Sequence, residues 1–213
     1  MNALLKKSLA EFAGVTVFLT AITAGANNGL KPFTVALALA LMILVTGGVS
    51  GGHLNPAVSL FFYSRKEINL GTFLAYVGAQ VAGAFAGASL GALLTGTVNK
   101  SFIASGGTIA PMAIAGEVVA TAGLVWIIGT LVQNKLGNLI PFAVGAWIIT
   151  AASFTSTGAQ ANPAVTFGLM VQGSWPTSFG APLIVAQVAG VLVAILLLIV
   201  FAPKAKKTAA RKK

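Results

Sequence analysis

Two copies of one motif lie in this chain: SGGHLNPAVS at residues 50–59 and TGAQANPAVT at residues 157–166. Each copy is a glycine-bearing loop that leads to Asn-Pro-Ala, and each lies between long apolar runs. A residue before proline is disfavoured in the α region, whereas proline suits the first position of a helix. The motif therefore predicts two helices that begin at Pro56 and Pro163, each capped by the preceding asparagine.

The composition places the chain in a membrane. Hydrophobic residues make up 57% of the sequence, charged residues only 8%, and the mean hydropathy is +0.93. Apolar runs of about 20 residues, which suffice to cross a bilayer as a helix, recur along its length. The chain has no cysteine, so disulfides and thiolate metal sites are excluded. We expect an integral membrane protein without a metal or a cofactor.

The apolar runs predict six transmembrane helices, at residues 8–26, 33–49, 69–94, 109–132, 139–154 and 179–202. Two shorter stretches, 56–63 and 163–171, follow the Asn-Pro-Ala motifs and are too short to span a bilayer. They are predicted to be half-helices that turn back inside the membrane. Such helices direct unpaired N–H groups and the positive end of the helix dipole into the membrane interior, where they can handle a polar solute.

An internal repeat relates the two halves of the chain. Asn162 lies 107 positions after Asn55, and the same offset carries the pentapeptide AQVAG at 79–83 onto an identical one at 186–190. Each half contains an odd number of spans, so the two halves must be inverted relative to one another. Inverted repeats with broken helices place a solute site at the membrane midplane. We expect one domain, residues 1–213, with repeats at about 8–95 and 109–202 and a basic tail at 203–213.

The distribution of basic residues predicts the orientation of the chain. Lys and Arg together number 13, and most lie on the side that carries both termini. That side holds Lys6, Lys7, Arg65, Lys66, Lys135 and the tail residues Lys204, Lys206, Lys207, Arg211, Lys212 and Lys213, whereas the other side holds Lys31 and Lys100. The excess predicts cytoplasmic N- and C-termini. The tail is predicted to lie near anionic lipid headgroups rather than to bind nucleic acid.

The sequence says less about which cellular membrane contains the protein. A signal peptide is not expected, because the first apolar run is too long and no cleavage pattern follows it. A compact chain of this kind fits the cytoplasmic membrane of a bacterial cell. An intracellular eukaryotic membrane is the alternative.

Taken together, these features resemble the aquaporin family, also called the major intrinsic proteins. The resemblance covers nearly the whole chain: the paired motifs, the six spans, the two half-helices, and one glutamate near the start of each half, Glu11 and Glu117. It implies an all-α membrane fold in which both half-helices meet at the centre. It also implies a pore in every subunit, assembly as a homotetramer, and contact with the lipid bilayer.

The motif residues are the strongest candidates for the pore: Asn55, Pro56, Ala57, Asn162, Pro163 and Ala164. The two asparagine amides can donate to a passing water or hydroxyl while the helix dipoles orient it. A role as helix caps alone is the alternative. The repeat pairs His53 with Gln160, and both are predicted to line the pore, as the resemblance also implies for a histidine at this place. A structural role for His53 is the alternative, and no partner exists for metal binding.

The two glutamates within spans, Glu11 and Glu117, are candidates for proton coupling, because carboxylates inside a membrane are often functional. Their repeat-related placement favours a structural role instead, in which they accept hydrogen bonds from the backbone of the re-entrant loops. The resemblance implies the same role. Small residues at Gly83, Gly87 and Gly91 form a stripe that predicts a close helix crossing.

The resemblance also locates a selectivity filter of four residues by their spacing from the motifs: Val35, Thr150, Ala159 and Val165. The last position is usually arginine in the family, and water-selective members usually have Phe and His at the first two. Here the filter is small, largely apolar and without a fixed cation. Losing the arginine also removes an electrostatic barrier to cations.

These residues favour a passive channel for water and small uncharged solutes such as polyols, urea or neutral metalloid acids. A water-selective channel is the alternative. An ion-coupled secondary transporter also uses inverted repeats, but it normally needs buried ionisable groups that are free to act. No nucleophile–base arrangement or metal set is present, so an enzyme is not expected.

Overall fold

The structure is a computed structural model that describes residues 1–25, 29–97 and 107–202. Within these residues six helices are long and apolar enough to cross a membrane. They are α1 (Ala3–Ala24), α2 (Lys31–Ser50), α4 (Leu70–Thr95), α5 (Pro111–Gln133), α6 (Ile140–Phe154, extended at its start by the 3-10 turn η1, Gly137–Leu139) and α8 (Thr177–Val200). Two shorter helices, α3 (Pro56–Ser64) and α7 (Pro163–Gln172), follow the Asn-Pro-Ala motifs. The predicted fold class is confirmed.

Most helix ends lie within a few residues of the sequence prediction, and the start of α1 is the main correction. The helix begins at Ala3 rather than at residue 8, because the side chain of Asn2 caps it and Oδ1 accepts the backbone N–H of Leu4 at 3.0 Å. The first two lysines are therefore part of the helix. Lys100 and the basic tail at 203–213 lie outside the described residues.

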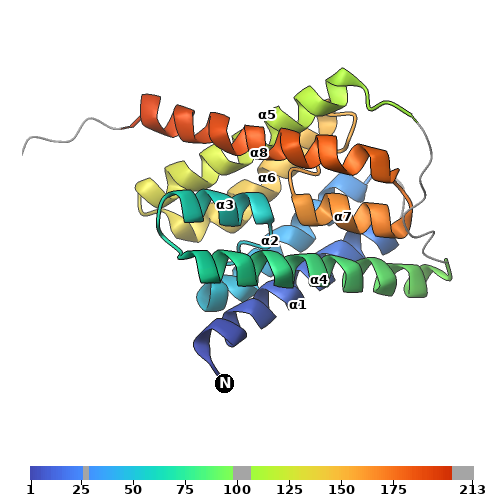
Figure 1. The fold of residues 1–213 in the computed structure, drawn as a ribbon, viewed down its shortest axis with the longest axis horizontal. Coiled ribbons are helices and arrows are strands. Elements are labelled where there is room, and N and C mark those ends of the chain that lie inside the picture. Colours follow the sequence, from blue (N-terminus) through green and yellow to red (C-terminus); the bar gives the residue numbers. More distant parts are fainter. Residues whose placement is uncertain (26–28, 98–106, 203–213) are drawn as a thin grey trace, which may run out of the picture.

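The two halves interlock through their half-helices (Figure 1). Helix α1 packs along α4 in the first half, and α5 packs along α8 in the second. Half-helix α7 lies against α4 and α1, whereas α3 lies against α8 and α5 as well as α4. In Figure 1 the N-terminal ends of α3 and α7 face each other in the middle of the bundle. Each half therefore supplies a half-helix that packs against helices of the other half.

The long helices of each half cross closely at glycines. A Cβ atom placed on Gly83 of α4 would lie 2.5 Å from the backbone oxygen of Phe12 in α1. One placed on Gly190 of α8, 107 positions later, would lie 2.7 Å from the backbone oxygen of Val118 in α5. Small residues permit such close backbone approach inside a membrane. The predicted close crossing is confirmed, and it is repeated in both halves.

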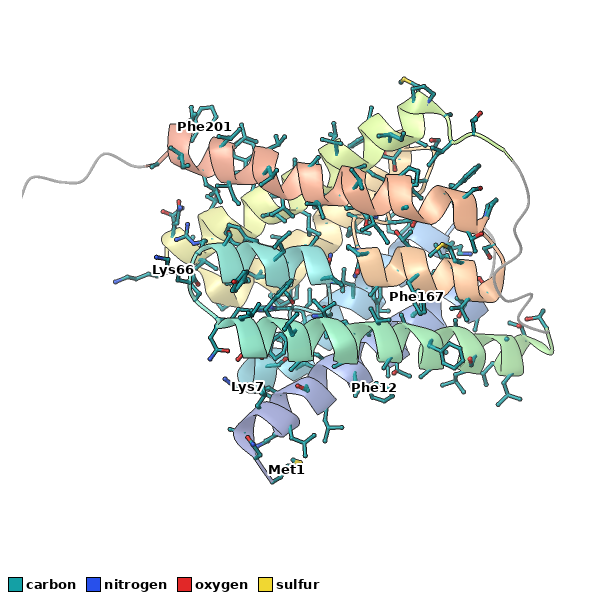
Figure 2. All side chains as sticks on the ribbon, viewed as in Figure 1. Met1, Lys7, Phe12, Lys66, Phe167 and Phe201 are labelled. Carbon is teal, nitrogen blue, oxygen red and sulfur yellow. The ribbon has the colours of Figure 1, made fainter. Side chains whose placement is uncertain are left out.

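Both ends of the described chain lie at the same end of the bundle. Figure 2 shows Lys7, Lys66 and Phe201 together there. This arrangement agrees with the even total of six spans, and it brings Lys6 and Lys7 to the side that carries the basic turn between α3 and α4. The chain is an integral membrane protein.

Candidate functional site

The two half-helices begin at asparagines that also tie the two loops together. Asn55 Oδ1 accepts the N–H of Ala57 at 2.8 Å, and Asn162 Oδ1 accepts that of Ala164 at 2.9 Å, so each asparagine caps its own helix. The amide nitrogen Nδ2 of Asn55 donates to the carbonyl oxygen of Ala161 at 2.8 Å, and that of Asn162 donates to Leu54 at 3.0 Å. An amide group has two N–H donors, so one on each asparagine has no partner in these bonds.

A buried glutamate fixes the shape of each loop. Glu117 accepts four hydrogen bonds: Oε1 from the hydroxyl of Thr157 at 2.5 Å and the N–H of Gln160 at 2.9 Å, and Oε2 from the N–H of Ala161 at 2.8 Å and the side chain of Gln187 at 2.7 Å. Both carboxylate oxygens are thus fully engaged.

Glu11 repeats this pattern in the first half. Its donors are the hydroxyl of Ser50 at 2.6 Å, the N–H groups of His53 at 3.0 Å and Leu54 at 2.6 Å, and the side chain of Gln80 at 2.7 Å. Each of these donors lies 107 positions before its counterpart around Glu117. Two carboxylates that are saturated in the same way have the geometry of loop anchors.

The loops themselves use a backbone conformation that residues with side chains rarely adopt. The φ angle is positive at Gly52 (62°) and Leu54 (50°), and at their repeat counterparts Ala159 (56°) and Ala161 (46°). A left-handed conformation costs a residue with a Cβ atom about 1–2 kcal/mol. The hydrogen bonds to Glu11 and Glu117 hold the loops in this strained path.

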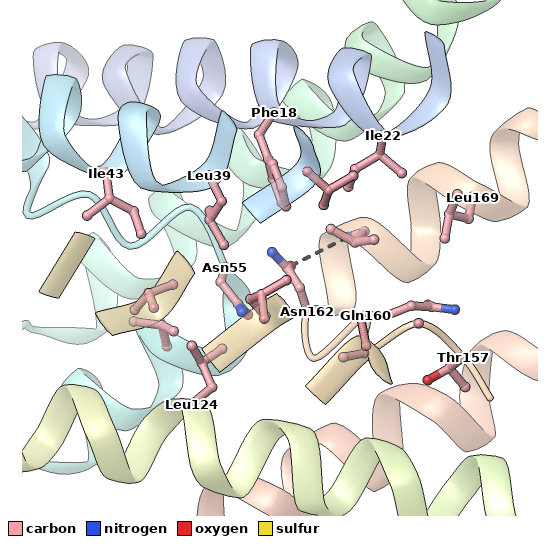
Figure 3. Close-up of a pocket in the computed structure, with 18 of the residues that line it drawn as sticks. Phe18, Ile22, Leu39, Ile43, Asn55, Leu124, Thr157, Gln160, Asn162 and Leu169 are labelled. Atoms are coloured by element: carbon pink, nitrogen blue, oxygen red, sulfur yellow. Dashed lines mark hydrogen bonds between the residues drawn. The ribbon is translucent and has the colours of Figure 1, made fainter. Parts of the chain in front are cut away.

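A cavity of about 460 Å³ runs past the two asparagines (Figure 3). Apolar side chains from α1, α2, α5 and α6 form much of its lining, with Phe18, Leu39 and Leu124 among them. The polar part comes from the two loops and includes the asparagines, His53 and Gln160. In Figure 3 the side chains of Asn55 and Asn162 lie close together near the centre of the cavity. The cavity offers hydrogen-bonding groups on the loops beside an apolar wall, as a path for small polar molecules requires.

Three of the four residues expected in the filter line this cavity: Val35, Ala159 and Val165. Thr150 does not line it, and the prediction for this residue is wrong. Its side chain lies on the exposed outer side of α6, where its hydroxyl donates to the backbone oxygen of Ala146 at 2.9 Å. Helix α6 instead presents a face of residues four apart to the cavity: Ile140, Val144, Ile148 and Ala152.

The error at Thr150 has a geometric cause. Counting twelve residues back from Asn162 assumes a particular rotation of α6 about its axis. Two residues along an α-helix turn the side chain by about 200°, so Ile148 and Thr150 point to opposite sides. The structure turns Ile148 inward, so this part of α6 presents an apolar isoleucine to the cavity and not the hydroxyl of Thr150.

This assignment predicts a difference between two cysteine variants. Because the natural chain has no cysteine, a mercurial thiol reagent should leave it untouched. Ile148→Cys places a thiol in the cavity, so we expect the reagent to block most of the water flow measured in proteoliposomes. Thr150→Cys should retain its flow after the same treatment. Block of Thr150→Cys alone would show that the cavity face of α6 is assigned wrongly.

Comparison with known proteins identifies the family. Residues 2–157 and residues 138–213 both match the family described as major intrinsic protein. The chain belongs to this family. Major intrinsic proteins are membrane channels and not enzymes, so the resemblance inferred from the motifs is confirmed.

Several relatives of this major intrinsic protein are described as plant aquaporins. A probable aquaporin TIP-type of Medicago truncatula is 34% identical over 219 residues, which cover 90% of this chain and 87% of the relative. A probable aquaporin TIP1-1 of Oryza sativa subsp. japonica is 35% identical over 224 residues, with the same coverage. Among solved structures, the aquaglyceroporin from Plasmodium falciparum matches with a TM-score of 0.68 and 23% identity, covering 94% of this chain and 98% of that one. The last comparison supports the fold alone.

Sequence reasoning about this major intrinsic protein missed the polar residues that support the loops. Gln80 and Gln187 were visible only as part of the repeated pentapeptide, and Ser59 and Thr166 were given no role in supporting the loops. Each glutamine nitrogen Nε2 bridges a glutamate to one of these hydroxyls, at 3.0 Å in both halves. The available signal was a glutamine inside an apolar span at matching places in both repeats.

Proposed function

We propose that this major intrinsic protein is a passive channel that conducts water and small uncharged solutes through a wide filter without arginine. The observation that carries the proposal is the cavity of about 460 Å³ beside Asn55 and Asn162. This volume lies within the range of about 300–1,000 Å³ that small-molecule sites usually have. The paired asparagine amides supply donors at its centre, and the dipoles of α3 and α7 orient a passing oxygen.

The proposed filter consists of Val35, Ile148, Ala159 and Val165, with Ile148 in place of Thr150. None of these side chains is charged or aromatic. Among the described lining residues, only Lys31, at the start of α2, carries a charged side chain. A filter lined only by aliphatic side chains favours solutes that are neutral and wider than water. A water-selective channel would be expected to have bulkier or charged side chains here.

The arrangement of the glutamates argues against ion coupling. A coupling group must exchange a proton or bind an ion during transport, and it needs a free lone pair or a free proton for this. Glu11 and Glu117 each accept four hydrogen bonds from the protein. We therefore propose that both act as structural supports of the loops.

Stopped-flow light scattering on proteoliposomes tests the proposed function. Water, glycerol and urea permeabilities would be compared with those of empty liposomes, with Asn162→Asp as a variant altered at the pore centre. Solute flux well above the background, together with water flux, would support the proposal. Fast water flow without glycerol or urea flux would instead support a water-selective channel.

Introducing an arginine at position 165 of the proposed filter should block the passage of glycerol and urea. Val165 is buried and lines the cavity, so Val165→Arg adds both bulk and a fixed positive charge to the constriction. We expect glycerol and urea permeabilities to fall to near the liposome background while some water flow remains. Val165→Leu is the control for a small change of volume without charge. Unchanged solute flux in Val165→Arg would contradict this account of the filter.

We also propose a homotetramer in which each subunit carries its own pore. We place the protein in the cell membrane, with both termini in the cytoplasm. The family resemblance supports the tetramer, and the basic residues near the termini support the orientation. Mass measurement of the detergent-solubilised protein tests the first part. Proteolysis of the basic tail in inside-out vesicles tests the second.

A further inference from the structure

The internal repeat matches the cavity lining of one re-entrant segment to that of the other. Every lining residue in the first loop and α3 has a lining counterpart 107 positions later, in the second loop and α7. The six pairs are Gly51 and Gly158, Gly52 and Ala159, His53 and Gln160, Asn55 and Asn162, Val58 and Val165, and Phe62 and Leu169. The two ends of the cavity can therefore be compared residue by residue.

The last pair lies far from the central asparagines, at opposite ends of the cavity. Figure 1 shows α3 and α7 leaving the middle of the bundle in opposite directions. Phe62 lies two residues before the end of α3 at Ser64, on the side where Figure 2 shows Lys7 and Lys66. Leu169 holds the matching place on α7. We call the two sides the Lys66 end and the Leu169 end of the cavity.

The two ends differ in the bulk of their side chains. Phe62 and Leu169 are both half-buried and both line the cavity, but the first carries a phenyl ring and the second an isobutyl group. The opposite difference at Gly52 and Ala159 amounts to one methyl group. The matched residues therefore leave less room at the Lys66 end.

Contacts with neighbouring rings hold Phe62 in place. Its ring stacks on the imidazole of His53, with centroids 4.5 Å apart and planes 17° from parallel, and Phe61 contacts it at 5.3 Å. His53 is itself fixed, because its Nδ1 lies 3.1 Å from the hydroxyl oxygen of Ser59 and Tyr76 contacts its ring at 5.2 Å. Aromatic pairs in such arrangements attract one another beyond the area that they bury. The ring of Phe62 therefore resists moving aside for a wide solute.

The other helices present branched aliphatic groups at the same end. Helices α2 and α5 end there, and α6 begins there (Figure 1). Their lining residues near this end are Ile43, Ile128 and Ile140. Side chains that branch at Cβ have few allowed rotamers, so these groups are also stiff. The Lys66 end of the cavity is thus bounded by a held pair of rings and by isoleucines.

We propose that Phe62 is a specificity-determining residue, which with His53 forms a second filter at the Lys66 end of the cavity. This second filter is narrower than the filter of Val35, Ile148, Ala159 and Val165, and it sets the largest uncharged solute that passes. The inference rests on the proposed function, since it concerns how solutes cross the same pore.

A filter of this composition discriminates by cross-section more than by hydrogen bonding. The phenyl ring and the isoleucines offer no donors or acceptors, so a solute gains little from them and must fit between them. Water is the smallest permeant and is affected least by the width of the filter. A bulkier polyol such as ribitol, with five carbons, is affected more than glycerol or urea.

Phe62→Leu tests the proposal, because it gives position 62 the side chain of its counterpart Leu169. We expect ribitol permeability in proteoliposomes to rise about tenfold, the lower end of what one methylene group contributes to discrimination in an apolar pocket. Water and urea permeabilities should change little. Unchanged ribitol permeability would overturn the proposal. An equal rise for water, urea and ribitol would also overturn it, because that result indicates a loosened bundle.

The adjacent phenylalanine provides a matched control. Phe61 is 1% exposed, packs against α5 and α8, and is not among the described residues that line the cavity. Phe61→Leu makes the same substitution on the same helix but away from the path of the solute. We expect its ratio of ribitol to urea permeability to equal that of the natural protein. A rise as large as that in Phe62→Leu would contradict the role of Phe62.

The natural protein separates failure of this inference from failure of the proposed function. Glycerol and urea fluxes at the level of empty liposomes would contradict the proposed function. With those fluxes well above the background, an unchanged ratio of ribitol to urea permeability in Phe62→Leu would contradict the second filter alone.

Discussion

Glu117→Gln is expected to lower the free energy of unfolding by about 2–6 kcal/mol, because two buried donors would lose their acceptor at about 1–3 kcal/mol each. The carboxylate accepts from four donors, two on each oxygen. In glutamine one oxygen becomes an NH₂ group, which faces two of those donors with hydrogens of its own. Thermal unfolding of the purified protein in detergent, followed by loss of helical signal, would measure the effect.

The chain provides both a repeat of this experiment and a control. Glu11→Gln should give a loss of similar size, since Glu11 accepts from an equivalent set of donors. Glu67, the remaining acidic residue, is partly exposed and pairs with Arg65 at 2.7 Å. Glu67→Gln should cost less than about 1 kcal/mol, as surface ion pairs usually do. If Glu117→Gln melted at the same temperature as Glu67→Gln, the carboxylate would not be an anchor of the loop.

Gly83→Ala is expected to destabilise the protein by about 1–3 kcal/mol, the usual cost of overpacking a close-packed interior. The added methyl group would lie 2.5 Å from the backbone oxygen of Phe12, which cannot move without shifting α1. Gly190→Ala should have a comparable effect, because its methyl group would lie 2.7 Å from the backbone oxygen of Val118. The melting temperature in detergent is again the measurement.

Gly78 is a matched control on the same helix. A Cβ atom added there meets nothing within 4 Å, and the residue is exposed. Alanine is favoured over glycine inside a helix by about 0.5–1 kcal/mol, so Gly78→Ala should leave the protein as stable or slightly more stable. A common response of Gly78→Ala and Gly83→Ala would mean that the α1–α4 crossing does not depend on the missing side chain.

The long-range features of the fold could be predicted because they depend on hydropathy and on the repeat. Spans of about 20 apolar residues leave little choice but helices, since backbone polar groups must be satisfied internally in a bilayer. The half-helices followed from prolines at Pro56 and Pro163 and from the short distance to the next polar turn. The start of α1 was less predictable, because it depends on one side-chain cap at Asn2.

The candidate site was predictable where chemistry and the repeat coincide. Asn55, Asn162, Glu11 and Glu117 stand out because polar residues in apolar surroundings recur at matching places. The rotation of α6 could not be obtained in this way, since it is set by packing against its neighbours, and Thr150 was therefore misplaced.

The exchange of bonds between Asn55 and Ala161, and between Asn162 and Leu54, has a consequence for biosynthesis. When the ribosome has delivered only the first half, Glu11 and its donors are present, but the carbonyl that receives the amide of Asn55 has not been made. At that stage Asn55 caps α3, but the hydrogen bond from its amide to Ala161 cannot form, and α3 lacks its contacts with α5 and α8. Both hydrogen bonds between the loops, Asn55 to Ala161 and Asn162 to Leu54, can form only after the second loop has entered the membrane from the opposite face. The pore is thus a joint product of two insertion events, and neither half of the nascent chain contains a finished one.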